Sequence, residues 1–201
     1  MAGEQDGGDE EILMFIRSER LFLRPGWPED WQELFTRIAD ERIVRNLARV
    51  PWPYTAEAAH EFVGLPQDRR YPHFLITLPT SEGSRLVGCI GLSPVDDGPG
   101  EESIELGYWI ARDQWNRGYA TEAARAMLSL ARTLGHRRVT ASHYTDNPAS
   151  AGVLRKLGFH TTGQVRPRFS LGRGGLFPAE IHALTLSGGS DCDGDQVGYA
   201  A

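Results

Sequence analysis

The stretch from Trp115 to Glu122 is where residue types and spacing point most clearly to chemistry. It lies between an apolar run over 104–110, typical of a strand, and a run over 119–134 with helical periodicity. Gly118 and Ala120 are small residues at the point where the loop becomes helix. The first turn of a helix offers unpaired backbone N–H groups at the positive end of the helix dipole, and small side chains let a phosphate come close to them. The stretch therefore predicts a site for a diphosphate group.

The remaining elements follow from the periodicity of apolar residues and from the Gly and Pro residues that interrupt it. Strands are expected over 15–24, 73–78, 85–92, 103–110, 138–144, 159–165 and 180–186. Helices are expected over 28–38, 41–47, 55–65, 119–134 and 147–157. Strands and helices in this order predict a layered α/β or α+β fold.

Length and composition favour one soluble domain. The chain has 201 residues, of which 40% are hydrophobic and 24% charged, as is usual for a globular protein. We expect a single domain over 12–186 between flexible polar tails over 1–11 and 187–201. Two cysteines, Cys89 and Cys192, are too few for a disulfide framework and are expected to be reduced thiols.

Charge and hydropathy exclude several classes of partner. The net charge is −6, which argues against nucleic acid as the main partner. No run of apolar residues is long enough to predict a membrane span. The N-terminus lacks the basic start and apolar stretch of a secretory signal, so we expect a cytoplasmic protein.

The loop resembles that of a known family. Arg117-Gly118-Tyr119-Ala120 is similar to the pyrophosphate loop of the GNAT acetyltransferases, whose pattern is Gln/Arg-x-x-Gly-x-Gly/Ala. Trp115 stands at the Gln/Arg position and departs from that pattern. The departure resembles one branch, the ribosomal-protein N-terminal (alanine) acetyltransferase-like group, in which Trp-x-x-Gly-Tyr-Ala-Thr-Glu is usual.

Four more segments resemble the same branch in the expected order, so that the resemblance covers nearly the whole ordered chain. They are Arg20–Pro25 followed by Glu29-Asp30, Leu86–Leu92, Ile104–Ile110, and Asn147–Ser150 with Leu157-Gly158-Phe159. The resemblance implies a mixed, mostly antiparallel sheet of about seven strands, flanked by helices. It also implies that the fourth and fifth strands, over 104–110 and 138–144, splay apart at their C-terminal ends.

The resemblance implies that acetyl-CoA, the acyl donor, enters that opening. Its pantetheine arm would pair with the backbone of Trp109 and Ile110, much as an added strand would. Asn147 would bond the pantetheine while also capping its helix. The residues implied to hold the diphosphate are Asn116, Arg117, Gly118, Tyr119, Ala120 and Thr121.

The same resemblance provides candidates for the chemistry. Many family members protonate the leaving thiolate with a Tyr on the helix over 147–157, but the matching position here is Leu154. Ser150 is therefore the candidate proton donor, directly or through water. Glu105 is the candidate base or ammonium-binding group, the alternative being a salt bridge to a nearby Arg or a bond to loop N–H groups. His143 is a weaker candidate base.

The pKa of the acceptor amine sets how strong the base must be. An α-amino group has a pKa of about 7.7–8.0, so its neutral form costs only about 1–1.4 kcal/mol at pH 7. A lysine-like amine, with a pKa of about 10.4, costs roughly 4.6 kcal/mol. A peptide N-terminus thus needs only a weak base or a water chain, whereas a lysine or polyamine needs a well-placed carboxylate.

We therefore expect an N-acetyltransferase that moves an acetyl group directly to a primary amine. A protein or peptide N-terminus is the first hypothesis for the acceptor. The alternatives are a small-molecule amine, such as an antibiotic or polyamine, and a non-catalytic acyl-CoA-binding module. Each of these hypotheses is compatible with a monomer or a homodimer.

The remaining aromatic residues and histidines have simpler expected roles. Trp52 and Tyr54, among prolines, are candidates to line the acceptor pocket. Two departures from the branch, Pro178 and His182, also lie on the acceptor side. No metal is expected, because the remaining histidines show no metal-ligand spacing. These are His60, His73, His136, His160 and His182.

Overall fold

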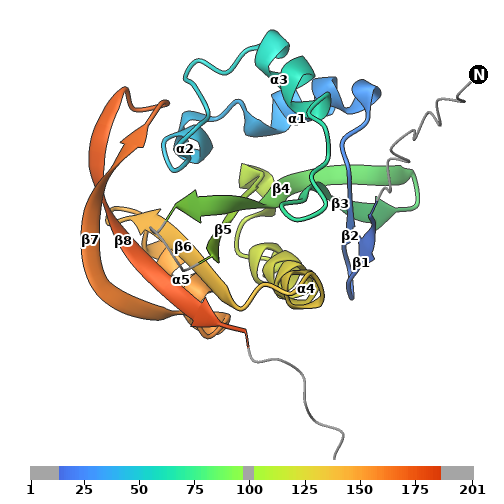
Figure 1. Cartoon of the computed structure of the whole chain (residues 1–201). Helices are drawn as coiled ribbons and strands as arrows, with labels where there is room; N and C mark the ends of the chain where they lie inside the picture. The colour runs from blue at the N-terminus through green and yellow to red at the C-terminus, as the bar shows by residue number, and fades with distance from the viewer. Residues whose placement is uncertain (1–13, 97–101, 187–201) are drawn as a thin grey trace, which may run out of the picture.

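The computed structural model describes residues 14–96 and 102–186. The predicted tails over 1–11 and 187–201, and Cys192 with them, lie outside the described residues. The described chain forms one open sheet of eight strands, in the order β1-β2-β3-β4-β5-β6-β8-β7. Helices α1, α2 and α3 cover one face of the sheet, and α4 and α5 cover the other (Figure 1). The mixed, mostly antiparallel sheet is as predicted, with eight strands instead of about seven.

The first predicted strand is divided in two. A turn at Ser18, whose N–H donates to the Leu21 carbonyl at 2.9 Å, separates β1 (Ile16–Arg17) from β2 (Phe22–Arg24). The helices that follow are a 3-10 turn, η1 (Pro28–Asp30), then α1 (Trp31–Ile38), α2 (Glu41–Val44) and α3 (Ala56–Val63). Their order agrees with the periodicity, although α2 ends earlier than expected.

The middle of the sheet is an antiparallel meander of β3 (His73–Thr80), β4 (Gly83–Asp96) and β5 (Glu102–Ile110). The strands β4 and β5 approach very closely at one point. A Cβ placed on Gly88 would lie 2.2 Å from the Trp109 carbonyl oxygen, so only glycine fits there. This contact fixes the course of the last residues of β5.

The predicted splay lies between β5 and β6. After β5 come η2 (Arg112–Gln114), α4 (Tyr119–Thr133), β6 (Arg138–Tyr144) and α5 (Pro148–Lys156). The parallel pairing of β5 with β6 consists of Ile104 opposite Val139 and Glu105 opposite Thr140. Beyond these pairs the two strands diverge, which leaves the second half of β5 with a free edge toward β6. The opening implied by the resemblance is therefore present.

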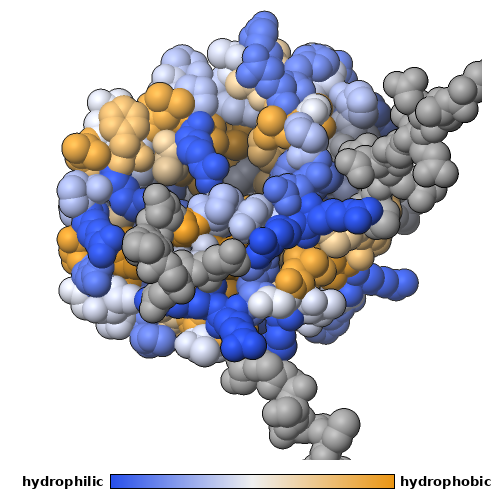
Figure 2. Space-filling view, in the orientation of Figure 1, coloured by the Kyte–Doolittle hydropathy of each residue, from blue (hydrophilic) through white to orange (hydrophobic). Residues whose placement is uncertain are grey.

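The last hairpin is longer than its pattern predicted. Strands β7 (His160–Ser170) and β8 (Gly175–Thr185) extend past the sheet toward the helices, and the Leu171 N–H donates to the Ala48 carbonyl at 2.9 Å. Apolar side chains lie exposed along this hairpin. They are Val165, Phe169, Leu171 and Leu176. Figure 2 shows apolar surface on the side of the molecule where β7 and β8 lie in Figure 1.

Side chains alternate between two cores. Ile104, Leu106 and Ile110 belong to the core beneath α4 and α5, and Trp109 belongs to the core beneath α1–α3. Among the described residues, no helix is both long and apolar enough to span a membrane.

Candidate functional site

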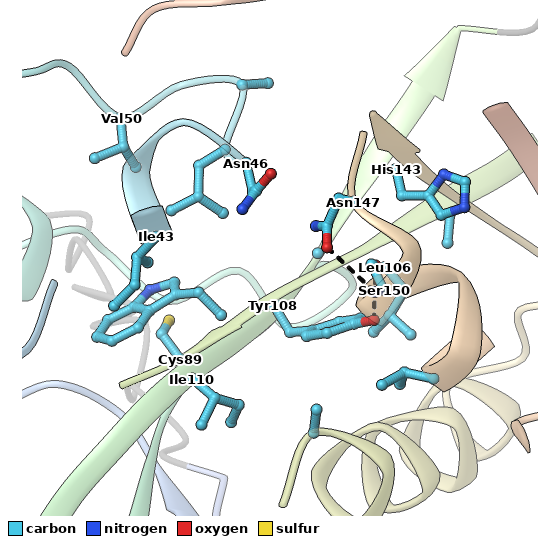
Figure 3. A pocket seen from close by; sticks show the side chains of 18 of the residues that line it. Ile43, Asn46, Val50, Cys89, Leu106, Tyr108, Ile110, His143, Asn147 and Ser150 are labelled. Atoms are coloured by element: carbon cyan, nitrogen blue, oxygen red, sulfur yellow. Dashed lines mark hydrogen bonds between the residues drawn. The ribbon is translucent and has the colours of Figure 1, made fainter. Parts of the chain in front are cut away.

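A cavity of about 1160 Å³ extends from the opening between β5 and β6 to the space beneath α1–α3. Its walls combine backbone from the N-terminus of α4 with side chains from both faces of the sheet (Figure 3). Most of the predicted site residues line it. They are Glu105, Trp109, Ile110, Asn116, Gly118, Tyr119, Ala120, Thr121, Asn147 and Ser150. Arg117 does not line the cavity and is exposed on the outside of the loop.

The N-terminus of α4 presents backbone N–H groups to the cavity. Gly118 precedes the helix with φ of 82°, a conformation that glycine adopts without steric cost. The Glu122 N–H makes the first bond of the helix, to the Gly118 carbonyl at 3.0 Å. The amides of Tyr119, Ala120 and Thr121 come before it, in the turn that a helix leaves without internal acceptors. Unpaired amides at the positive end of a helix dipole are suited to binding an anion.

A network from the N-terminal hairpin holds this loop in place. Glu122 accepts hydrogen bonds from Ser18 Oγ at 2.7 Å, the Arg20 N–H at 2.7 Å and Arg20 Nε at 2.8 Å. Arg20 also donates to the Arg117 carbonyl at 3.1 Å and lies over the Tyr119 ring. Burial alone would raise the pKa of Glu122, but the bonds from Arg20 and Ser18 hold it below its ordinary value.

The free edge of β5 presents alternate residues to the gap. The Ile104 carbonyl accepts from Thr140 Oγ1 on β6 at 3.1 Å, so the backbone groups of Ile110, an even number of residues later, point the same way. The Trp109 carbonyl points toward Gly88 on β4 instead. Ile110 thus stays a candidate for backbone contact, whereas Trp109 lines the cavity with its side chain. The Trp115 indole donates to the Ile110 carbonyl at 2.7 Å. Trp115, which replaces the Gln or Arg of the family pattern, therefore has a structural role.

Two hydroxyl groups meet at the N-terminus of α5. Tyr108 Oη and Ser150 Oγ lie 2.9 Å apart, and Asn147 caps the helix by accepting from the Ser150 N–H at 3.4 Å (Figure 3). Burial raises the pKa of Tyr108 to about 12, although the bond to Ser150 opposes the shift. The phenol therefore keeps its proton at neutral pH. Sequence analysis missed Tyr108, whose alternation with Glu105 and Trp109 could have placed it on the α5 side.

Glu105 is paired with a guanidinium group. Arg168 binds both of its carboxylate oxygens, with Nη2 to Oε2 at 2.9 Å and a second contact from Nη1 to Oε1. Ser142 Oγ donates to Oε1 at 2.9 Å. Hydrogen bonding to Glu105 raises the pKa of Arg168, against the effect of burial. Of the alternatives considered for Glu105, the structure shows the salt bridge, which competes with a role as free base.

The acceptor side of the cavity is largely apolar. Its lining includes Ile43, Leu47, Val50, Tyr54 and Phe62. Burial raises the pKa of Tyr54 to about 12. Trp52, the other predicted aromatic, does not line the cavity and is 40% exposed.

The tip of the last hairpin closes the acceptor side. Arg173 binds Asp146 through both terminal nitrogens, each at 2.9 Å, and stacks on Tyr144 and Phe177. Its side chain is only 8% exposed.

The fold, the splayed strands and the loop occur together in a known family. Residues 20–160 match the family described as Acetyltransferase (GNAT) domain. The chain belongs to the GNAT acetyltransferases. One structural neighbour with the same fold is the ribosomal L7/L12 α-N-protein acetyltransferase RimL in complex with coenzyme A. That structure has a TM-score of 0.69 at 19% identity, over 86% of this chain and 98% of RimL.

Other relatives show the spread of the family. A Bacillus subtilis protein, the uncharacterized N-acetyltransferase YoaA, is 26% identical over 77% of this chain and 88% of its own length. The Microcin C7 self-immunity acetyltransferase MccE, solved with acetyl-CoA and AMP, has a TM-score of 0.68 at 17% identity, over 84% of this chain and 93% of MccE. GNAT relatives that bind coenzyme A or acetyl-CoA thus differ in what else they bind.

Proposed function

We propose that this protein transfers the acetyl group of acetyl-CoA directly to a primary amine. The observation that carries the proposal is that three parts meet in one cavity. They are the N-terminus of α4, the free edge of β5, and the paired hydroxyls of Tyr108 and Ser150. An anion site, a strand edge and a proton donor are what a diphosphate, a pantetheine arm and a leaving thiolate require.

On the cofactor side, backbone groups of the loop would bind the diphosphate. The contacts would come from the amides of Asn116, Arg117, Gly118, Tyr119, Ala120 and Thr121. The backbone of Ile110 and the Asn147 side chain would hold the pantetheine arm. The cavity supplies an opening at this place, and the positive φ values of Asn116 and Gly118 shape the loop around it.

The hydroxyl pair would supply the proton for the leaving thiolate. Ser150 Oγ would donate a proton and receive one from Tyr108 Oη, which the raised pKa keeps protonated. Tyr108 reaches this position from β5, so it fills the place left by Leu154 on α5. Leu154 itself is 1% exposed, in the apolar core.

Glu105 would bind and orient the incoming amine. Its carboxylate lies in the cavity and is paired with Arg168. An α-amino group needs no strong base, because its neutral form costs only about 1–1.4 kcal/mol at pH 7. A water chain would carry the amine proton away. This argument favours a protein or peptide N-terminus as the acceptor.

A small-molecule amine is the second candidate. The contacts of Leu171 with Ala48 and of Arg173 with Asp146 close the acceptor side between the hairpin and α2. A bounded, largely apolar chamber suits a compact amine, and MccE shows that this fold accommodates a nucleotide as well as acetyl-CoA.

A coenzyme A release assay over a panel of acceptors tests the proposal. The panel contains peptides with free and blocked N-termini, lysine side-chain amines, polyamines and aminoacyl nucleotides. Turnover with free N-termini, lost on blocking, would support the first candidate. Turnover of small amines alone would support the second. Tight acetyl-CoA binding with no turnover of any acceptor would mean a non-catalytic binding module.

A further inference from the structure

Three potential metal ligands from two strands meet on the α5 side of the sheet. His143 on β6 stands opposite Glu180 on β8, and His182 follows two residues after Glu180. Side chains two residues apart on a strand share a face, and directly opposed residues share it too. Pairing of the strands thus brings together histidines that are 39 positions apart in the chain (182 − 143).

Both histidines are buried and incompletely bonded. His143 is 7% and His182 is 8% exposed. Within the described part of the chain, His143 Nδ1 and His182 Nε2 are buried without a hydrogen-bond partner. A buried polar atom left unsatisfied costs about 1–3 kcal/mol. Since His182 Nε2 is also the atom that faces Glu180, it indicates that a ligand group completes the cluster.

The distances are those of an open metal site. His143 Nε2 lies 4.0 Å from Glu180 Oε2, and His182 Nε2 lies 3.8 Å from Glu180 Oε1. One ligand atom from each residue can be chosen so that all lie within 4.8 Å of one another. Ligands about 2.0–2.2 Å from a zinc ion are about 3.5–3.8 Å apart in a three-ligand plane. The Glu180 side chain, 34% exposed, is free to close the remaining gap.

We propose that His143, Glu180 and His182 bind one divalent transition-metal ion, with Zn²⁺ as the best match. Two imidazoles and a carboxylate form a typical zinc donor set, whereas Mg²⁺ and Ca²⁺ prefer oxygen ligands. Three protein ligands leave a fourth position for water or another group. Spacing along the chain does not indicate this cluster, because only the pairing of β6 with β8 brings its residues together.

The position of the ion indicates what it does. Figure 3 shows the His143 ring turned away from Asn147, Tyr108 and Ser150, while His143 also lines the cavity wall. The ion therefore lies behind that wall. There it links β6 to β8 beside the opening between β5 and β6, so its expected effect is on stability.

Zinc binding to the full-length chain tests the proposal. The untagged protein, treated with a chelator and dialysed, is titrated with Zn²⁺ by calorimetry. We expect one ion per chain and a rise in melting temperature on adding the ion. His182→Gln and Glu180→Gln are each expected to weaken binding at least tenfold and to abolish the rise. His160→Gln, an exposed histidine on neighbouring β7, is the matched control and keeps both.

Two results would overturn the proposal. One is a wild-type chain that binds no Zn²⁺. The other is equal zinc affinity in the wild type, the control and both cluster variants, which would place the ion elsewhere. Circular dichroism verifies that each variant is folded. Glu180→Gln, at a partly exposed side chain, provides the test if His182→Gln does not fold.

Discussion

The cofactor side and the acceptor side of the cavity are built in different ways. On the cofactor side, consecutive residues around Gly118 present backbone N–H groups, and the neighbouring network of Arg20 and Glu122 only holds the loop. On the acceptor side, side chains from distant segments meet, as Glu105 does with Arg168 and Arg173 does with Asp146.

This difference affects how each side tolerates change. A site made of backbone groups depends on local conformation and tolerates substitution of many side chains. Proteins with one fold can therefore bind the same cofactor despite different sequences. A side-chain site depends on which residues the hairpin brings over the cavity, so the acceptor can change without altering the cofactor side. The predictions below separate the two sides.

The largest expected effect on acetyl-CoA binding comes from Gly118→Val. Gly118 has φ of 82°, where an L-residue costs about 1–2 kcal/mol, and a Cβ there would lie 3.4 Å from Arg20 Nη2, in the network that holds the loop. We expect KM for acetyl-CoA to rise by at least about tenfold, the equivalent of about 1.4 kcal/mol. Steady-state kinetics at saturating acceptor measures it.

Gly135→Val is the matched control for Gly118→Val. Gly135 follows α4 with φ of 87° and lies at the opposite end of the same helix. It should lose similar stability in urea unfolding while its KM for acetyl-CoA stays unchanged. Equal increases of KM in the two variants would mean that strain alone, and no diphosphate site, explains the effect.

The largest expected effect on turnover comes from the hydroxyl pair. Tyr108→Phe with Ser150→Ala removes both donors, and we expect kcat to fall by about 100-fold, within the range for general acid–base catalysis. KM for acetyl-CoA should change little. Tyr71→Phe, which alters a tyrosine outside the cavity lining, is the control. A double variant with wild-type kcat would assign protonation of the thiolate to solvent.

The acceptor side should respond to the pair of Glu105 and Arg168. Glu105→Gln is expected to raise KM for the amine roughly tenfold. The variant loses a charge-assisted contact of about 1.5–3 kcal/mol, and the pairing of Glu105 with Arg168 reduces the size of that loss. KM for acetyl-CoA should remain unchanged. Arg168→Gln should free the Glu105 carboxylate from its ion pair and lower KM for the amine. An unchanged acceptor profile in both variants would remove the pair from amine binding.

A smaller effect is expected on stability at high pH, because both sides of the cavity contain buried groups with a raised pKa. Tyr54 on the acceptor side and Tyr108 on the cofactor side both have a pKa raised to about 12, as has the Cys89 thiol, because all are buried. A raised pKa in the folded state means that each group stabilises the folded chain while it is protonated. Their contribution to stability is complete below the unfolded pKa values of about 8.5–10 and is lost as pH rises toward 12.

Urea unfolding between pH 7 and 11 measures that loss. We expect the unfolding midpoint to fall above about pH 9, and less steeply in Tyr54→Phe and Tyr108→Phe. A slope that neither variant alters would show that other groups cause the alkaline loss.

The smallest effect is on the support of the cofactor loop. Arg20 is 44% exposed, so its pair with Glu122 contributes only about 0–1 kcal/mol. Arg20→Ala should raise KM for acetyl-CoA about two- to fivefold by loosening the Arg117 carbonyl. Arg17→Ala, on the same hairpin, should not. A large effect of Arg20→Ala would mean that the guanidinium binds the cofactor itself.

The elements that could be predicted are those with local signals. Helix α4, strand β6 and the Asn147 cap were predicted within a residue or so, because apolar periodicity and capping residues lie within single segments. The turn at Ser18 was missed, since a short polar break inside an apolar run has the pattern of one strand. The splay between β5 and β6 came from the family resemblance and could not be derived from composition.

The candidate site divides in the same way. The loop around Gly118 could be predicted from the sequence because its functional groups belong to consecutive residues. The contacts of Tyr108 with Ser150, and of Glu105 with Arg168, join residues 42 and 63 positions apart, and only the folded sheet brings them together.

Hydrogen–deuterium exchange on the full chain with and without acetyl-CoA tests the central claim most directly. We predict that the cofactor slows exchange in the amides of Tyr119–Thr121 and along the free edge of β5, and leaves the hairpin tip at Leu171–Gly174 unchanged. Protection confined to the hairpin and α2, with no change at the start of α4, would contradict the assignment of the two sides.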